Sequence, residues 1–241
     1  MKLIKLLANL GYGSRKDADK LIRSGVVTDV EGNALKSKDF PGLENIRVLG
    51  EELDPVGPLV IVMNKPDGFT CSREDPGETV YELLPHRFSK RNPGINPVGR
   101  LDKDTTGMLL LTDDGKFLHQ VIHPKSGCRK VYHVVLDRPL SGEEGEIFGS
   151  GELVLESETK PLLPAEFEAL GEKEALITLH EGRYHQVRRM FAAVGNHVLE
   201  LERISIGGLK LPEDLEVGDW RFVTAEEQAA IFGPLPEISG H

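Results

Sequence analysis

Residues 99–115 read Gly-Arg-Leu-Asp-Lys-Asp-Thr-Thr-Gly-Met-Leu-Leu-Leu-Thr-Asp-Asp-Gly. Asp102 stands two positions after Arg100 in a turn bounded by glycines, and an apolar run over 107–112 follows. The run has the length of a buried strand, and Asp-Asp-Gly then turns the chain. Because loops held by a rigid sheet often carry reacting groups, Asp102 could be a nucleophile, a metal ligand or a turn former.

Charge is distributed unevenly along the 241 residues, whose formal net charge is −10. Residues 1–38 carry eight Lys and Arg against four Asp and Glu, so this segment has a charge of +4 and the remainder −14. The negative total argues against binding of nucleic acid by bulk attraction. A basic end on an acidic body is typical of a local polyanion-binding module, although a solvated helix surface would give the same pattern.

The sequence indicates neither a metal nor a cofactor. Cys71 and Cys128 are far apart and form no Cys-x-x-Cys pair, which argues against a disulfide framework and a zinc site. There is no P-loop and no Gly-x-Gly-x-x-Gly motif. No apolar run approaches the roughly 18–20 residues of a membrane span, and the N-terminus lacks the features of a signal peptide. We therefore expect a cytoplasmic monomer without metal, cofactor or membrane partner.

The N-terminal segment predicts two short helices and a small hairpin. Leucines at helical spacing precede Gly11: Leu3, Leu6, Leu7 and Leu10. Ser14 can cap a second helix that ends at Gly25, and a strand over 26–27 and a turn over 31–33 follow. Four basic residues lie on or beside the second helix: Arg15, Lys16, Lys20 and Arg23.

A change in composition divides the chain into two domains. Residues 50–58 have linker composition, so we predict one domain over 1–55, a second over 56–235 and a loose tail over 236–241. In the second domain several strands follow one another without an intervening helix, which favours an α+β fold with a mixed, mostly antiparallel sheet. The predicted strands are 59–63, 107–112, 130–136, 152–156, 164–170, 174–180 and 197–206. The predicted helices are 79–84, 116–122, 142–149, 184–194 and 225–232.

Two further segments carry candidate functional residues. Residues 129–134, Arg-Lys-Val-Tyr-His-Val, predict a strand in which Lys130 and Tyr132 share one face. Residues 181–191, Glu-Gly-Arg-Tyr-His-Gln-Val-Arg-Arg-Met-Phe, lead into a helix whose apolar side packs against the body. Taken alone, Tyr132 is most simply explained by packing within a strand, and Arg188 by a solvated helix face.

Together with residues 64–68, Asn-Lys-Pro-Asp-Gly, these segments resemble the motifs of pseudouridine synthases, and 181–197 resembles the small-subunit branch of the ribosomal enzymes. The likeness runs over nearly the whole chain. Residues 14–16 and 21–27 likewise resemble an S4 RNA-binding domain, although the turn over 28–33 is longer and more acidic than is usual in that family. The resemblance implies an S4-like domain joined to a pseudouridine synthase catalytic domain.

The resemblance also implies a role for each matching residue. Asp102 would be the essential carboxylate, Tyr132 would lie against the uracil and assist removal of its C5 proton, and Arg188 would pair with Asp102. Val187 would form part of the apolar wall under the base. The residues expected to contact RNA are Arg100, Lys65, Lys130, Arg183, Arg15, Lys16, Lys20 and Arg23. The implied substrate is a uridine of small-subunit (16S) ribosomal RNA, either free or in a ribosome assembly intermediate.

The chemistry of this reaction fits these residue types. Converting uridine to pseudouridine breaks a C–N glycosidic bond and makes a C–C bond at the same sugar carbon, with no redox change. An ionised carboxylate can act as a nucleophile or stabilise an oxocarbenium-like sugar, and a guanidinium within about 4–6 Å favours the charged form. Flipping the base costs a few kcal/mol, which stacking on an aromatic ring offsets. The sequence leaves open whether the carboxylate attacks the sugar, attacks the base or removes a sugar proton.

Three other sites fit the sequence less well. Residues 102–105, Asp-Lys-Asp-Thr, match the start of Mg²⁺-dependent haloacid-dehalogenase phosphatases, but in those enzymes the apolar strand precedes the first Asp. His180 and His185 are five positions apart, which does not fit a zinc-protease helix. His119 and His123 have helical spacing but no evident third ligand.

Two alternatives to small-subunit modification remain open. One is a pseudouridine synthase for large-subunit RNA, and the other is an S4-type RNA-binding assembly factor with a degenerate catalytic domain. The joint presence of Asp102, Tyr132 and Arg188 argues against the second.

Overall fold

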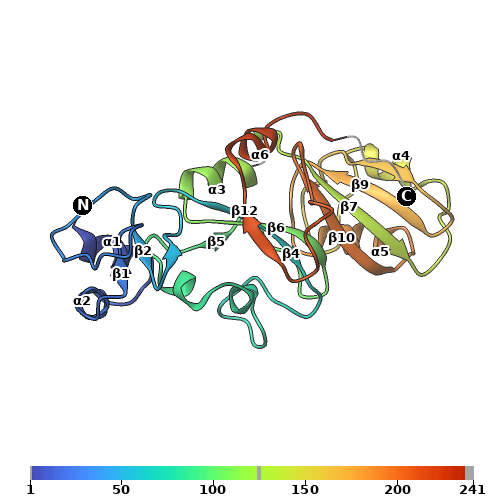
Figure 1. The fold of residues 1–241 in the computed structure, drawn as a ribbon. Coiled ribbons are helices and arrows are strands. Elements are labelled where there is room, and N and C mark those ends of the chain that lie inside the picture. Colours follow the sequence, from blue (N-terminus) through green and yellow to red (C-terminus); the bar gives the residue numbers. More distant parts are fainter. Residues whose placement is uncertain (1, 124–125, 237–241) are drawn as a thin grey trace. The chain divides into compact units, whose positions relative to one another are not determined.

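The computed structural model describes residues 2–123 and 126–236, and the chain divides into two compact units (Figure 1). Unit 1 comprises Met1–Val60, Tyr81–Asn96 and Thr112–Asp114, and unit 2 comprises Ile61–Val80, Pro97–Leu111 and Gly115–His241. Unit 1 contains all of the predicted domain 1–55 together with two later segments, and the boundary between residues 55 and 56 stays a prediction. The predicted tail 236–241 lies outside the described residues except for Pro236.

Unit 1 begins with the two predicted helices, α1 (Leu3–Asn9) and α2 (Arg15–Arg23). Ser14 caps α2, because its hydroxyl accepts from the Asp17 backbone N–H and the Asp17 carboxylate accepts from the Ser14 backbone N–H. Gly25 has a φ of 77°, a left-handed conformation that glycine adopts without strain after a helix. A small antiparallel sheet follows, with strands β1 (Val27–Thr28), β2 (Arg47–Val48) and β3 (Glu51–Glu52).

The leucines predicted for the first helix form the core of this helix pair and sheet. They are buried together with residues of α2 and the sheet: Leu3, Leu6, Leu7, Leu10, Ala18, Ile22, Val27, Leu35, Ile46 and Val48. Their burial explains why so short a helix as α1 is stable, because tertiary packing supplies most of the stability of short helices.

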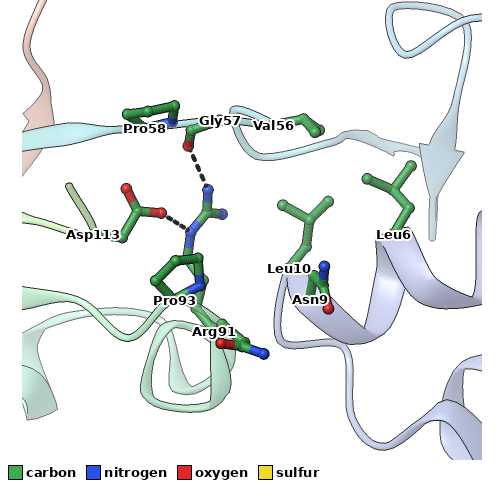
Figure 2. Close-up of a pocket in the computed structure, with 10 residues that line it drawn as sticks. Leu6, Asn9, Leu10, Val56, Gly57, Pro58, Arg91, Pro93 and Asp113 are labelled. Carbon is green, nitrogen blue, oxygen red and sulfur yellow. Dashed lines mark hydrogen bonds and ion pairs between the residues drawn. The ribbon is translucent and has the colours of Figure 1, made fainter. Parts of the chain in front are cut away.

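A buried ion pair anchors the predicted linker within unit 1 (Figure 2). Arg91 Nε donates to Asp113 Oδ2 at 2.8 Å, and both side chains are only 3% exposed. Asp113 Oδ1 accepts from the Leu59 backbone N–H at 2.8 Å, and Arg91 Nη2 donates to the carbonyls of Pro55 (2.6 Å) and Gly57 (3.2 Å). The pair borders a pocket of about 230 Å³. The stretch that composition marks as a linker is therefore tied down by charge-assisted hydrogen bonds.

The main sheet contains nine strands in the described part of the chain, seven of them in the order β12-β4-β6-β10-β7-β9-β8. β10 runs parallel to β6 and antiparallel to β7, and the β7–β9 and β9–β8 pairs are also antiparallel. This mixed sheet with flanking helices confirms the predicted α+β fold. The strands are β4 (Val60–Lys65), β5 (Asn96–Pro97), β6 (Thr106–Thr112), β7 (Lys130–Leu136), β8 (Glu166–Ala169), β9 (Glu174–Leu179), β10 (Val198–Ile206), β11 (Leu209–Lys210) and β12 (Trp220–Phe222).

Helices follow the sequence pattern with small shifts at their ends. The α-helices are α3 (Gly115–Ile122), α4 (Glu144–Gly149), α5 (Gln186–Ala193) and α6 (Ala225–Ala230), and 3₁₀ helices span Val80–Leu83 and His86–Lys90. The predicted helix over 79–84 is thus a 3₁₀ turn, whereas the predicted helix over 225–232 is α6, which begins with a capping box of Thr224 and Glu227. None of the helices in residues 2–123 and 126–236 is long and apolar enough to span a membrane.

The predicted strand over 152–156 is wrong. That stretch is irregular: Leu155 is 2% exposed in the core and Leu153 packs against the core, whereas Val154 is exposed. Its backbone bonds locally, since the Leu162 N–H donates to the Leu153 carbonyl at 2.8 Å. The short strands β5, β11 and β12 were not predicted, because two or three residues carry no periodic signal.

Candidate active site

A pocket of about 250 Å³ in unit 2 brings the three predicted functional segments together. Its floor is one face of the sheet, where Lys130 and Tyr132 of β7 lie beside Arg203 of β10. Tyr132 pairs directly with Arg203 across β7 and β10, and side chains two apart on a strand share a face. The loop 98–102 and the turn 181–187 form the walls. The pocket is therefore a sheet surface enclosed by two loops.

Lys65 fixes the loop that carries Asp102. Its side chain is fully buried at the end of β4, and Nζ donates to the carbonyls of Pro66 (3.0 Å), Lys103 (3.0 Å) and Thr105 (2.8 Å). Burial lowers the pKa of Lys65. The predicted contact between Lys65 and RNA is therefore corrected: the ammonium group has three partners inside the protein and no exposed surface.

Asp102 lies in the pocket with 28% of its side chain exposed, and its Oδ1 is 3.5 Å from Nε2 of His185. Burial raises the pKa of Asp102 above its usual range, and the charge of Asp104 adds to the rise. His185 opposes the rise, as do Arg188 and Lys65. Because burial has the largest effect, protonated Asp102 is more favoured in the folded protein than an aspartic acid side chain is in water.

Arg188 does not form the predicted direct ion pair with Asp102. Its Nη2 lies 3.0 Å from Oδ2 of Asp104 and also donates to the Asp104 carbonyl at 3.0 Å, while Nη1 donates to the Val198 carbonyl at 3.0 Å. The turn from Asp102 to Thr105, closed by a 3.1 Å backbone bond, presents Asp104 to Arg188. Arg188 still lowers the pKa of Asp102, so its effect on that carboxylate is electrostatic.

His185 is a site residue that the sequence analysis missed. It occupies the N-cap position of α5 with φ 48° and ψ 35°, a left-handed conformation that is uncommon for residues other than glycine. Its ring stacks on that of Tyr184, with centroids 3.8 Å apart and an angle of 17° between the planes. The predicted helix over 184–194 therefore begins only at Gln186. An imidazole three positions before Arg188 in the same motif was a visible signal, but only the fold places it beside a carboxylate.

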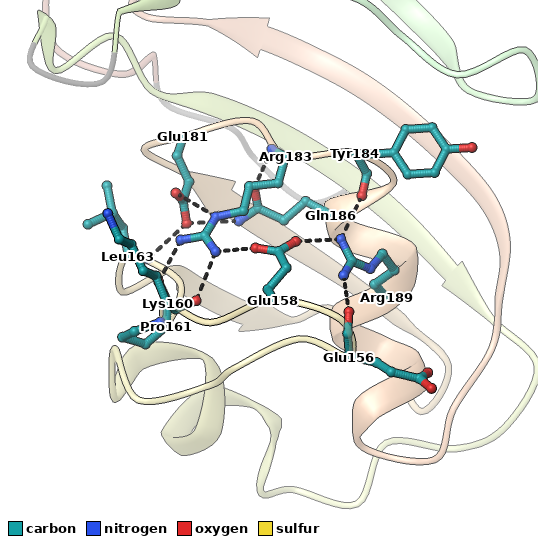
Figure 3. A network of polar contacts seen from close by, with 10 residues as sticks. All are labelled: Glu156, Glu158, Lys160, Pro161, Leu163, Glu181, Arg183, Tyr184, Gln186 and Arg189. Carbon is teal, nitrogen blue, oxygen red and sulfur yellow. Dashed lines mark hydrogen bonds and ion pairs between the residues drawn. The ribbon is translucent and has the colours of Figure 1, made fainter.

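A network of carboxylates and guanidinium groups holds the turn before α5 (Figure 3). Glu158 accepts hydrogen bonds from both Arg183 and Arg189, the latter at 2.6 Å. Arg189 also donates to the backbone carbonyls of Tyr184 (3.2 Å) and Glu156 (2.6 Å). The irregular segment after α4 is thereby tied to the pocket wall.

Arg183 is taken up by this network. Its Nε donates to Oε2 of Glu181 at 3.1 Å, and its other nitrogens donate to the carbonyls of Lys160 (2.9 Å) and Pro161 (2.5 Å) as well as to Glu158. Two carboxylates balance its charge, and its donors already have partners. The geometry corrects the predicted RNA contact of Arg183 to a structural role.

Three further predicted site residues line the pocket, and the expected RNA contacts of Arg100 and Lys130 stay predictions. Val187 is 3% exposed and lines the wall, so its role beneath a base stays a prediction. Arg100 is exposed at the pocket. Lys130 is partly buried and donates to the Cys128 carbonyl at 2.9 Å, and burial lowers its pKa.

The four basic residues of α2 are exposed in unit 1. Lys20 lies 3.9 Å from Asp17, and Arg23 lies 2.9 Å from Asp19. Arg15 and Lys16 share the same helix. Their predicted contacts with RNA stay predictions.

The alternative sites gain no support from the geometry. Within the described residues, no three His, Cys, Asp or Glu side chains are arranged to hold a metal ion. Asp102 precedes β6 instead of following a strand, unlike the first carboxylate of a haloacid-dehalogenase phosphatase. His180 faces Glu166 at 3.4 Å whereas His185 faces Asp102, so the two histidines do not converge.

Similarity to known proteins covers the same segments. Residues 59–193 match the family of RNA pseudouridylate synthases. The chain is 43% identical over 235 residues to a Vibrio cholerae protein named ribosomal small subunit pseudouridine synthase A, covering 96% of this chain and 100% of that protein. The Escherichia coli (strain K12) protein of the same name is 39% identical over 235 residues, with the same coverage. A crystal structure of a pseudouridylate synthase superposes with a TM-score of 0.69 at 35% identity, covering 96% of this chain and 99% of the other.

Fold, pocket and similarity thus define a class of enzymes that isomerise nucleotides within RNA. The chain belongs to the RNA pseudouridine synthase family, which confirms the family expected from its motifs.

Replacing Asp102 by Asn should reduce turnover by at least about 1,000-fold, the order of loss found when a reacting side chain is removed. RNA binding should change little, because the pocket keeps its shape. Pseudouridine formation by the purified variant, measured beside its affinity for RNA, tests both statements. Measurable turnover would contradict the catalytic role of Asp102.

The same substitution should raise the melting temperature at neutral pH. Burial raises the folded-state pKa of Asp102 above its unfolded value, so the charged form costs stability above the folded pKa. The gain from Asp102→Asn is therefore present where the folded protein holds Asp102 ionised, and it disappears as the pH falls below the ordinary value of about 3.9. Melting curves of the wild type and the variant from neutral to acidic pH test this prediction. A lower melting temperature of the variant at pH 7 would contradict it.

Glu158→Gln should lower kcat between about 10- and 100-fold, because the turn carrying His185 loses the charge that aligns it. The melting temperature should fall by a few degrees. Glu156→Gln is the matched control, since Glu156 contributes only its backbone carbonyl to Arg189. Equal effects of the two substitutions on kcat would show that the network does not position the site.

Proposed function

We propose that this protein converts a uridine of small-subunit ribosomal RNA to pseudouridine without a cofactor. The observation that supports this most directly is the place of Asp102 in a pocket that also holds Tyr132 and His185. The relatives matched over nearly their whole length carry the name ribosomal small subunit pseudouridine synthase A. We place the reaction in the cytoplasm, with a monomer acting on free RNA or on an assembly intermediate.

The groups in the pocket match the steps of the reaction. The bond between C1′ and N1 breaks, its electron pair leaves with the base, and the carboxylate of Asp102 compensates the electron-poor sugar. After the ring turns, C5 bonds to C1′, and the C5 proton is lost while N1 gains one. Tyr132 lines the pocket, and its proposed role is to lie against the ring and to assist the proton transfer. No electron acceptor is needed, because the product is an isomer of the substrate.

The nucleotide has to leave its helix to reach the pocket. Arg100 is exposed at the pocket and is suited to contact the RNA backbone beside the flipped nucleotide. The basic residues of α2 offer phosphate contacts in unit 1. Because the whole chain has a net charge of −10, affinity depends on these local cations and should fall as salt concentration rises.

Incubation of the protein with unmodified 16S and 23S transcripts, followed by mapping of modified bases, tests the proposed substrate. We expect one pseudouridine in the 16S transcript and none in the 23S transcript, with Asp102→Asn as the inactive control. Modification confined to 23S RNA would overturn the small-subunit assignment. Binding without turnover by the wild-type protein, on naked RNA and on assembly intermediates alike, would favour an assembly factor.

Neutralising Arg15 and Lys16 should raise the Kd for RNA about 3- to 10-fold and leave kcat at saturating RNA unchanged, because the substitutions remove phosphate contacts and alter no residue that lines the pocket. Lys36→Gln is the control, because it also removes the charge of an exposed basic residue, but outside α2. In titrations at several salt concentrations, the affinity of the double variant for RNA should fall less steeply with salt than that of the wild type. An unchanged affinity would contradict the role of α2.

A further inference from the structure

Two cations share the floor of the pocket without a carboxylate between them. Arg203 of β10 lies directly opposite Tyr132 of β7, and Lys130 is two residues before Tyr132 on the same face. Arg203 is 2% exposed. The floor therefore carries two positive charges beside the aromatic ring.

Neither side chain is paired with an acid. Arg203 Nε donates to the Met108 carbonyl at 2.8 Å, and its Nη2 is buried without a hydrogen-bond partner. Lys130 donates to the Cys128 carbonyl. Throughout residues 2–123 and 126–236, no carboxylate forms an ion pair with either of them, whereas the equally buried Arg91 has Asp113 at 2.8 Å.

This arrangement is costly in the free protein. A buried guanidinium loses its hydration, and a second cation nearby adds repulsion that a carboxylate would normally relieve. Unpaired buried cations in a pocket are typical of a site whose counter-charge arrives with the ligand. The acids that line the pocket are engaged elsewhere, Asp102 with His185 and Glu181 with Arg183.

We infer that Arg203, assisted by Lys130, binds a carbonyl oxygen of the flipped uracil and stabilises the negative charge that the ring carries during the reaction. This inference rests on the proposed function. Cleavage of the C1′–N1 bond leaves its electron pair on the base, spread over N1 and the two carbonyl oxygens. Attack of the carboxylate on C6 would instead move an electron pair to the carbonyl oxygen at C4. In each case charge grows on a carbonyl oxygen, and donors already in place stabilise it without reorganisation.

Arg203→Met should lower kcat at least about 100-fold, the usual loss when one preorganised donor is removed from a developing anion. The KM for RNA should stay within about 3-fold, because affinity comes mainly from phosphate contacts. The melting temperature should be unchanged or higher, since a buried unpaired charge has been removed. Arg129→Met is the matched control, because Arg129 pairs with Glu166 and does not line the pocket.

A binding measurement separates this inference from the proposed function. By calorimetry on the full chain, the wild type should bind 5-nitrouracil, which is anionic at neutral pH, at least about 10-fold more tightly than uracil, and Arg203→Met should lose that preference. Lys130→Met should reduce it and serves as the second variant if Arg203→Met does not fold. This readout needs no turnover, so it stands even if neither RNA transcript is modified.

The nucleotide phosphate is the other possible source of negative charge. If Arg203 bound it, Arg203→Met would lose the tighter binding of uridine 5′-monophosphate relative to uridine and keep the preference for 5-nitrouracil. That result would overturn the inference. An equal loss of kcat in Arg129→Met would overturn it as well, because the effect would then be general and structural.

Discussion

The position of the Asp102 carboxylate depends on a buried ammonium group. Lys65 has no exposed surface, and two of the three carbonyls that it binds belong to the loop directly after Asp102. A cation removed from water must keep such acceptors, so the loop cannot relax without leaving a charge unsatisfied. β6 begins at Thr106, immediately after this loop, and is buried along nearly its whole length. Asp102 is thus held in place by the chain that directly follows it.

Charge is used in two different ways around the pocket. In the wall before α5, Glu158 pairs with Arg183 and Arg189, and on the opposite loop Asp104 pairs with Arg188. Those cations serve the fold. Among the described residues no carboxylate forms an ion pair with Arg203 or Lys130, the two cations that we infer to bind the base. A chain with a net charge of −10 can therefore present a positive site to an electron-rich base.

Local sequence signals accounted for most of the elements. The leucine spacing of α1, the cap of α2 by Ser14 and the apolar run of β6 each act through neighbours in the chain, and each appears in the structure as predicted. The failures have a common cause. Leu153 and Leu155 pack in or against the core without pairing as a strand, and His185 leaves the helical conformation. Both depend on what packs against the segment, which periodicity does not record.

The sequence by itself determined the family, the α+β architecture and the residue types at the site. The reason is that motifs, and the periodicities of 3.6 residues in helices and 2 in strands, depend on residues close together in the chain. Only the tertiary structure decided which partner each charged side chain has. Lys65 binds the Lys103 carbonyl 38 positions away, and Arg188 reaches the Asp104 carbonyl across 84 positions. Partners at such separations are selected by the sheet order and by burial, and these arise only when the whole chain has folded.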